Sequence, residues 1–389
     1  MFSLISQVLD HEVFLDKRHG CGLSLTGHDP SDIPVSPLST LERGGPMGQW
    51  LSTRATRFAR RFLCSVVFFV LIVPLTALSQ HSTKIPFPYG PMGLNSMPWI
   101  VAKEANLFEK NGLNLDMIFV GVSTVMVQSM LSGSANVGGL GGPAVVSNVL
   151  RGGDIIQVAA TVPYFTQSLM VRSQITELGG LRGKKVGITR FGAVTDLALR
   201  ALLERNNIKD VTILQMGGLA ETMAGLAKGS VDGSMVSPPH TFTLLKQGFR
   251  EIVSPKDLRK LGIGFLTNGV VARRSYAAGN RDVVVRIIKA TAEGTKLMTT
   301  NEGLTKKLIS KYLYIDDPEL LQQSYLYVVE NFARDPAVPA GAMQWMAQQL
   351  AQMNLVDIKA LQNAPISAFY DNSYVDELKQ SGFFESLWR

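Results

Sequence analysis

The sequence contains very little cysteine and histidine for its length. Its 389 residues include two cysteines, Cys21 and Cys64, and five histidines. After residue 81 the chain has no cysteine, and His240 is its only histidine. This part of the chain therefore cannot supply a disulfide, a thiol nucleophile or a histidine-rich metal site. We accordingly expect neither a metal ion nor a cofactor.

The sequence also lacks a concentrated block of basic residues. The net charge is +7, but Lys and Arg are scattered and no basic run is interleaved with exposed aromatics. A nucleic-acid-binding surface is therefore not expected. A composition of 46% hydrophobic and 18% charged residues is typical of a globular protein, and the length suggests about two domains.

A single long apolar run stands near the N-terminus, at residues 62–78 (FLCSVVFFVLIVPLTAL), directly after an arginine-rich stretch. Its length is typical of an export signal, and Ala77 and Ser79 are small residues suited to cleavage. We predict a signal peptide at residues 47–79, cleaved near Ser79, and a mature protein exported to the periplasm. The alternative is an uncleaved membrane anchor, although the run lies near the lower limit for a membrane span.

Residues 1–46 are polar and lack periodicity, which is unusual in front of a signal peptide. We expect them to be a non-native or disordered extension, with translation beginning at Met47. Peptides from residues 1–46 in mass spectrometry of the precursor would contradict this hypothesis.

From residue 83 onward, short apolar strand patterns alternate with helical patterns, which predicts βαβ units and mainly parallel sheets. A strand at 84–90 precedes a helix at 96–112, and a strand at 167–172 completes the first set. The chain becomes wholly helical from about residue 280. We predict an α/β fold of two lobes, with the C-terminal helices packing on the first. The expected ranges are 80–172 with 270–389 for lobe 1 and 173–269 for lobe 2, with hinge crossings near 170–174 and 267–272.

Several stretches resemble the solute-binding proteins of ABC importers, in the group of nitrate-, sulfonate-, taurine- and pyrimidine-precursor-binding proteins. They are WIVAKEANLFEKNGLNLDMIFV, SMLSGSANVGGLGGPAVVSNVLRGGDIIQVAA, LRGKKVGITRFGAVTDLALRALLERNNI, MAGLAKGSVDGSMVSPP and FYDNSYVDELKQSGFF. The resemblance extends over about residues 85–385. It implies a type II periplasmic binding fold that closes like a Venus flytrap around one small polar or anionic solute. It further implies delivery to a membrane permease with its ATPase, by a protein that we expect to be a monomer. A sensor module of the same fold and a pyrimidine-synthase-like enzyme remain the alternatives.

The stretch ANVGGLGGPAVVSNVLRGGD, residues 135–154, also matches a relaxed dinucleotide-binding fingerprint. That motif needs an acidic residue about 20 positions further on to hold the ribose. Asp154 comes too early, and the next acidic residue is Glu177. The chain likewise has no phosphate loop and no G-x-S-x-G elbow, so we expect a binding protein and not an enzyme.

The glycine-rich turns that lead from strands into helices are the predicted binding elements, because free backbone N–H groups at a helix N-terminus bind anions. In the first lobe they comprise Gly93, Leu94, Asn95 and Ser96, then Leu140, Gly141 and Gly142. In the second lobe they comprise Arg190, Phe191, Gly192, Ala193 and Thr195. Arg190 is the candidate clamp for an anionic ligand. Each turn could equally serve only as a helix cap.

The remaining candidates lie at the ends of other strands. They are Tyr164, Phe165, Ser237, Pro238, His240 and Asn268. The two aromatic residues could wall the pocket or cover a core, and Asn268 could be a hinge or a ligand contact.

Overall fold

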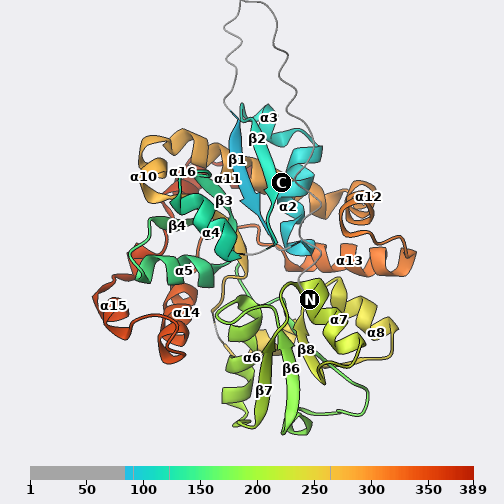
Figure 1. Ribbon diagram of the computed structural model, residues 1–389. Helices are drawn as coiled ribbons and strands as arrows, with labels where there is room; N and C mark the ends of the chain where they lie inside the picture. Colours follow the sequence, from blue (N-terminus) through green and yellow to red (C-terminus); the bar gives the residue numbers. More distant parts are fainter. Residues whose placement is uncertain (1–83, 91, 122, 263) are drawn as a thin grey trace, which may run out of the picture. The chain divides into compact units, whose positions relative to one another are not determined.

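The computed structural model describes residues 84–90, 92–121, 123–262 and 264–389 (Figure 1). The predicted extension and signal peptide, at residues 1–46 and 47–79, lie outside the described residues. All described residues belong to one compact unit that contains two five-stranded sheets. No helix among them is both long enough and apolar enough to cross a bilayer.

The first sheet has the order β2-β1-β3-β10-β4, and with the helices that pack on it forms what we call lobe 1. Its strands are β1 (Ile85–Tyr89), β2 (Leu115–Phe119), β3 (Val137–Leu140), β4 (Ile155–Val162) and β10 (Asn268–Arg273). β1 pairs in parallel with β2 and β3, whereas β10 runs antiparallel between β3 and β4. Every residue of β4 is buried, including the polar Gln157 and Thr161 within its otherwise apolar sequence.

The second sheet has the order β7-β6-β8-β5-β9 and, with its helices, forms lobe 2. Its strands are β5 (Ser168–Val171), β6 (Lys184–Ile188), β7 (Val211–Gln215), β8 (Gly233–Val236) and β9 (Arg250–Val253). β6 is parallel to β7 and β8, and β5 is antiparallel to β8 and β9.

Two predictions about the connections between the sheets are wrong. The strand at 167–172 was expected in the first set, but β5 belongs to the second sheet, so the first crossing lies at residues 163–167. The second crossing was expected near 267–272, but residues 268–272 belong to β10, an interior strand of the first sheet, so the second crossing ends at Thr267. An apolar strand pattern predicts a strand and not its partner, which explains both errors.

The helices of lobe 2 are η2 (Leu178–Leu181), α6 (Val194–Arg205), α7 (Leu219–Ala227), α8 (His240–Lys246) and α9 (Pro255–Lys260). Lobe 1 begins with η1 (Leu94–Ser96), α2 (Met97–Glu104), α3 (Leu107–Lys110), α4 (Ser123–Leu131) and α5 (Gly142–Leu150). The helix expected at 96–112 is divided between α2 and α3, because Asn106 adopts a left-handed conformation with φ of 53°.

The C-terminal part of the chain is helical, as predicted. It comprises α10 (Arg274–Gly279), α11 (Arg281–Thr300), α12 (Glu302–Leu313), α13 (Pro318–Asn331), α14 (Ala340–Gln352), α15 (Ile358–Asn363), η3 (Ile366–Ala368), α16 (Ser373–Gln380) and α17 (Phe383–Trp388). α11 packs on α2, α16 packs on α11, and α14 packs on α5. The close approach of α11 needs Gly294, where an added Cβ would lie 2.4 Å from the Pro98 carbonyl oxygen. The predicted packing of these helices on the first lobe is confirmed.

An aromatic cluster joins the two crossings between the sheets. Phe165 of the first crossing stacks on Phe265 of the second, with ring centroids 4.0 Å apart. Trp345 of α14 meets both rings edge-on, at 6.1 Å and 5.9 Å. Phe165 and Phe265 are fully buried, so the crossings are fixed to each other and to α14.

Candidate ligand-binding cavity

A cavity of about 630 Å³ lies between the two lobes, where strand ends and helix starts from both sheets meet. Lobe 1 lines it with the ends of β1 and β2, with α4, with α5 and with the end of α14. Lobe 2 lines it with the turns that lead into α6 and α7 and with the end of β8. This is the usual position of a ligand site in open α/β sheets.

The turn before α5 meets the turn before α6 across this cavity. Gly141 is the N-cap of α5, and a Cβ at this position would lie 2.7 Å from the Thr267 carbonyl oxygen and 3.3 Å from Cγ2 of Val194. Only glycine allows the backbone so close to the facing lobe. The N-terminus of α5 has neither a side-chain cap nor an acidic residue in its first turn. Its partial positive charge is therefore not neutralised from within the helix.

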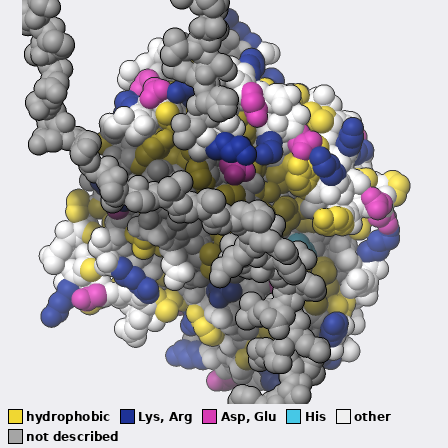
Figure 2. All heavy atoms as spheres, turned by 45° about the horizontal axis from the view of Figure 1, so that its top comes forward, with side chains coloured by type: hydrophobic (Ala, Val, Ile, Leu, Met, Phe, Trp, Pro, Cys, Tyr) yellow, Lys and Arg dark blue, Asp and Glu magenta, His cyan; other side chains and the backbone are white. Residues whose placement is uncertain are grey.

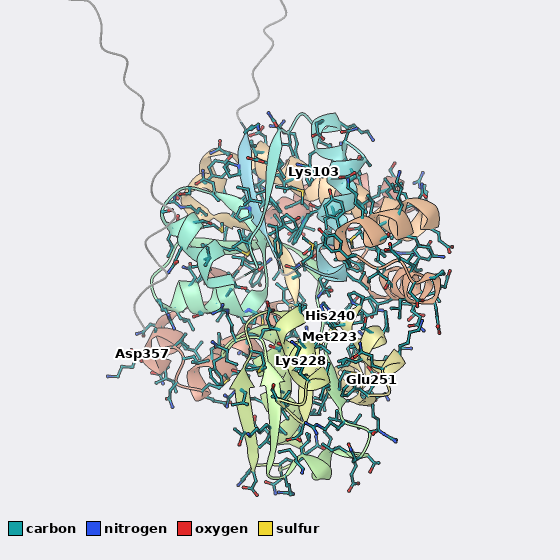
Figure 3. All side chains as sticks on the ribbon, turned by 45° about the vertical axis from the view of Figure 1, so that its right-hand side comes forward. Lys103, Met223, Lys228, His240, Glu251 and Asp357 are labelled. Carbon is teal, nitrogen blue, oxygen red and sulfur yellow. The ribbon has the colours of Figure 1, made fainter. Side chains whose placement is uncertain are left out.

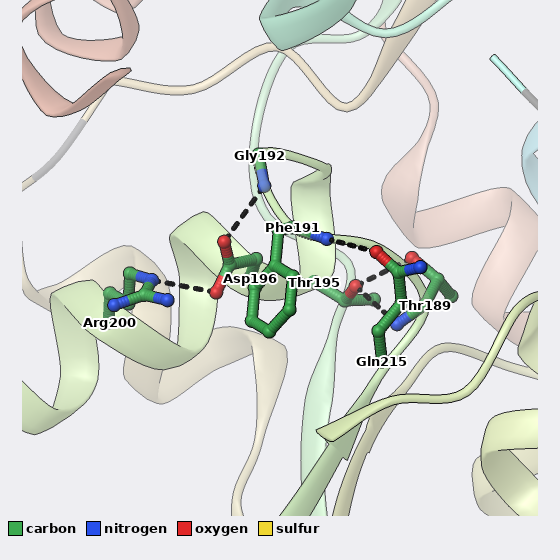
Figure 4. Close-up of polar contacts among 7 residues, drawn as sticks. All are labelled: Thr189, Phe191, Gly192, Thr195, Asp196, Arg200 and Gln215. Carbon is green, nitrogen blue, oxygen red and sulfur yellow. Dashed lines mark hydrogen bonds and ion pairs between the residues drawn. The ribbon is translucent and has the colours of Figure 1, made fainter. Parts of the chain in front are cut away.

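The turn before α6 is fixed by three side chains (Figure 4). Gln215 accepts a hydrogen bond from the Phe191 N–H at 3.1 Å, and Asp196 accepts one from the Gly192 N–H at 2.8 Å. Thr195 Oγ1 accepts the Thr189 N–H at 3.0 Å. Gly192 has a φ of +75°, which side-chain-bearing residues rarely adopt. The turn thus has one defined shape before any ligand binds.

Asp196 is fully buried behind this turn and forms an ion pair with Arg200, whose Nε lies 2.7 Å from Oδ1. Burial raises the pKa of the Asp196 carboxyl, although the Gly192 N–H and the Arg200 guanidinium oppose that shift. The α7 turn is similarly capped from within, because Glu221 accepts the Gly218 N–H at 2.9 Å. Of the three helix N-termini at the cavity, α5 is therefore the one without a carboxylate of its own.

Amide and hydroxyl side chains form the end of the cavity nearest the crossings. Asn95 Nδ2 donates to Thr166 Oγ1 at 3.2 Å, and Gln167 Nε2 donates to the same oxygen at 3.0 Å. Asn268 Nδ2 donates to the Asn95 carbonyl oxygen at 3.2 Å. All four residues are at least 92% buried, so the first crossing, the start of β10 and η1 are held in one network.

Charge on the described cavity wall has one sign. Arg190 and Arg151 line the cavity, and no Asp or Glu is among the described residues that do so. Arg190 Nε is buried and has no hydrogen-bond partner among the described residues. Arg151 is exposed and donates through Nη2 to the Leu355 carbonyl oxygen at 2.9 Å. A wall with two guanidinium groups and no carboxylate favours an anion.

Nine of the predicted site residues line the cavity: Asn95, Gly141, Arg190, Phe191, Gly192, Ala193, Thr195, Ser237 and Asn268. Nine others do not: Gly93, Leu94, Ser96, Leu140, Gly142, Tyr164, Phe165, Pro238 and His240. Phe165 belongs to the aromatic cluster described above, and Gly142 abuts Met346 of α14, whose methyl carbon would lie 2.4 Å from an added Cβ.

Tyr164 and His240 lie close to the junction of the lobes without lining the cavity. The Tyr164 ring faces the Arg259 guanidinium at 5.1 Å, and burial raises the pKa of its hydroxyl to about 12. His240 lies at the start of α8, at the end of lobe 2 nearest lobe 1 (Figure 3). Burial lowers the pKa of its imidazole, which favours the neutral ring.

Several polar residues of the cavity wall were not predicted from the sequence, among them Gln167, Thr189, Asn148 and Thr267. Gln167 and Thr189 lie beside the ends of β5 and β6, where polar residues are common in any α/β protein. The place of α14 in the wall was not predicted either, although its Leu350 lines the cavity together with Leu355. Leu355 approaches lobe 2, since its Cδ1 would lie 3.0 Å from a Cβ at Gly192.

On the face shown in Figure 2, Lys and Arg side chains are interspersed with Asp and Glu. The basic groups form no continuous stripe there. This distribution gives no indication of a nucleic-acid-binding surface on that face.

Comparison with known proteins decides the family. Residues 94–302, more than half of the chain, match the family model described as NMT1/THI5 like. The chain belongs to this family. A Brucella abortus protein that is named as a binding protein is 24% identical over 224 residues, which cover 57% of this chain and 68% of the relative.

Solved structures of periplasmic binding proteins share the fold of this NMT1/THI5-like chain. The aliphatic sulphonate binding protein SsuA of Escherichia coli aligns with a TM-score of 0.61 and 21% identity, over 71% of this chain and 94% of SsuA. The nitrate-binding protein NrtA of Synechocystis aligns with a TM-score of 0.64 and 13% identity, over 77% and 89%. SsuA of Xanthomonas axonopodis, solved with bound MOPS, aligns with a TM-score of 0.61 and 17% identity, over 75% and 98%. The fold is therefore that of the periplasmic binding proteins, as predicted.

Proposed function

We propose that this NMT1/THI5-like chain is the exported solute-binding protein of an ABC importer and binds a small organic anion between its lobes. The observation that carries this proposal is the cavity wall, where Arg190 and Arg151 face no carboxylate among the described lining residues. The partial positive charge at the N-terminus of α5 also favours an anion, and the amide groups of Asn95 and Gln167 add further donors. The sulphonate- and nitrate-binding proteins of the same fold also bind anions.

The size and polarity of the cavity favour an anion with an organic body. A volume of about 630 Å³ lies in the range of sites for drug-sized ligands and far exceeds a single oxyanion. The wall also includes apolar side chains, among them Val127, Leu131, Phe191 and Leu350. We expect the anionic group to lie toward Arg190 and the apolar body to lie against these side chains.

A thermal-shift screen of the full chain tests the ligand class. It compares MOPS, taurine, short alkanesulfonates, aromatic carboxylates, nitrate, pyrimidines and uncharged amides of matched size. A ligand at 100 times its dissociation constant should add about 2.7 kcal/mol of stability. Arg190→Gln should weaken binding of an anionic hit by about 10- to 100-fold, since a hydrogen bond to a charged group is lost.

Arg250→Gln is the matched control, because Arg250 lies in β9 of lobe 2 and is not among the residues that line the cavity. It should leave the affinity unchanged. A screen in which only uncharged compounds bind would refute the anion assignment. An Arg190→Gln variant that binds the anion as tightly as wild type would refute the role of Arg190.

Delivery to a permease is the second part of the proposal. In the proposed cycle, the solute favours the arrangement in which the lobes meet, and the partner permease recognises both lobes at once. The solute-loaded chain should stimulate the ATPase of a reconstituted permease complex, and the chain without solute should stimulate it less. Export is tested separately, by sequencing the N-terminus of the periplasmic form, which should begin near Gln80. Binding without any effect on a transporter would favour a sensor module.

A further inference from the structure

Away from the cavity, the lobes meet a second time through α13 of lobe 1 and α8 and α9 of lobe 2. Lys246, the last residue of α8, forms an ion pair with Asp317, the N-cap of α13. The Lys246 Nζ also lies 3.7 Å from Oε2 of Glu319. Along the same contact, the Phe242 and Tyr327 rings lie 6.4 Å apart and meet edge-on.

The other end of α13 is fixed beside the first crossing. Arg259 of α9 donates through Nη1 to Asn331 Oδ1 at 3.1 Å and to the Phe165 carbonyl oxygen at 3.5 Å. Asn331 is the last residue of α13 and Asp317 precedes its first residue. With a rise of 1.5 Å per residue, Asp317 lies about 20 Å along the helix from the crossing.

This length makes α13 a lever arm. A rotation of one lobe relative to the other by about 15° at the crossings would move Asp317 by up to roughly 5 Å. An exposed ion pair does not survive that displacement, because its attraction falls off over a few ångströms in water. The pair exists here together with the close approach of the α5 turn to lobe 2, where a Cβ added at Gly141 would lie 3.3 Å from Cγ2 of Val194. We call this the closed arrangement.

We propose that Lys246, Asp317 and Glu319 are positioning residues that set solute affinity from outside the cavity, by favouring the closed arrangement before a solute binds. None of the three lines the cavity. The effect on affinity rests on the proposed function, whereas the effect on lobe closure does not. The signs of the charges are complementary, since one ammonium group of lobe 2 lies between two carboxylates of lobe 1.

The pair differs from the other ion pairs of similar exposure because it crosses between lobes. Lys311 pairs with Glu104 at 3.0 Å, but both residues belong to lobe 1. Lys311→Gln therefore removes a comparable surface ion pair without affecting lobe closure. It is the matched control for Lys246→Gln.

Closure is measured on the unliganded full chain by electron–electron double resonance. Spin labels at Glu109→Cys in α3 and Lys209→Cys in lobe 2 report the distance between lobes, with Cys21 and Cys64 replaced by serine. Lys246→Gln should lower the ratio of closed to open molecules by about 1.4-fold to fivefold, the range measured for exposed ion pairs. Lys311→Gln should leave the distribution unchanged.

Salt and charge reversal complete the test. Raising the salt concentration from about 0.05 M to about 0.5 M should shift wild type in the same direction and leave Lys246→Gln unaffected. Lys246→Glu should open the protein further than Lys246→Gln, and adding Glu319→Lys should restore part of the closure. With MOPS as the probe, Lys246→Gln should raise the dissociation constant by the same factor as it lowers the fraction of closed molecules.

An unchanged distance distribution in Lys246→Gln, or a shift toward shorter distances, would overturn the proposal. So would equal effects of Lys246→Gln and Lys311→Gln, since those would indicate a general charge effect. If MOPS and the other anions fail to bind at all, the proposed function fails. The distance measurement on the unliganded protein still decides the role of Lys246.

Discussion

Gly141→Ala tests the geometry at a point where the two lobes approach closely. Gly141 has a φ of −79° and a ψ of 152°, which alanine adopts without strain. The substitution therefore acts through contacts and not through the backbone conformation. The added methyl group would lie 2.7 Å from the Thr267 carbonyl oxygen and 3.3 Å from a Val194 methyl group.

The two contacts differ in how easily they can adjust. Thr267 precedes β10, so its carbonyl oxygen can move only with the backbone of the second crossing. Overpacking of this kind typically costs about 1–3 kcal/mol. Alanine also reduces the entropy of the unfolded chain, which offsets about 0.4–1 kcal/mol. We expect Gly141→Ala to be destabilised by about 1–2 kcal/mol and to bind MOPS more weakly, because Val194 and its lobe are displaced.

The assay is guanidinium unfolding of the full chain, followed by circular dichroism, with Gly341→Ala as the matched control. Gly341 is exposed in the first turn of α14, and a Cβ there would have no neighbour within 4 Å. Gly341→Ala should be stabilised by about 0.5–1 kcal/mol, since alanine favours a helix over glycine. If Gly141→Ala is as stable as Gly341→Ala, the close approach of the second crossing to α5 is wrong.

Three further predictions concern other parts of the fold. Hydrogen bonds from Ser254 and the ion pair with Lys260 lower the pKa of Asp257 to about 2, so its stabilisation of α9 should be present above pH 4 and lost as the pH falls toward 2. In thermal melts, Asp257→Asn should be less stable than wild type at pH 7 and equal to it near pH 2. Burial lowers the pKa of His240 below 6.5, so the free energy of unfolding of wild type should fall as the pH drops below 6.5. In urea melts, wild type should therefore be less stable at pH 5.5 than at pH 7.5, and His240→Gln should show a smaller difference between the two pH values. Phe265→Ala should cost about 3–5 kcal/mol in guanidinium melts because the ring is fully buried, and a cost below 1 kcal/mol would contradict its place in the aromatic cluster.

The sequence predicts where the helices and strands lie better than it predicts which strands pair with each other. The chain was expected to be helical from about residue 280, and the long helix α11 indeed begins at Arg281. The strand at 168–171 was recognised but assigned to the wrong sheet, because its pairing with β8 and β9 involves residues more than 60 positions away. Helix periodicity is a local property, whereas strand pairing is not.

In the candidate site, too, local features were predicted and long-range contacts were not. The glycine turns before α5 and α6 were predictable, because a strand, a glycine and a helix start follow one another in the sequence. Phe165 was predicted at the cavity and lies in a core instead. Its environment depends on Phe265 and Trp345, which are 100 and 180 residues further along the chain. A single strand-end aromatic carries no information about such distant partners.

The position of β10 has a consequence for the order in which the chain can fold. β10 separates β3 from β4, so the first sheet is incomplete until residue 273 has been made, after the whole of lobe 2. Until then, β3 and β4 present unpaired edges that can join another chain. An export partner or chaperone that holds these edges apart would protect the nascent protein from aggregation. Fragments that end before Asn268 should accordingly be prone to aggregation, although they contain every strand of the second sheet.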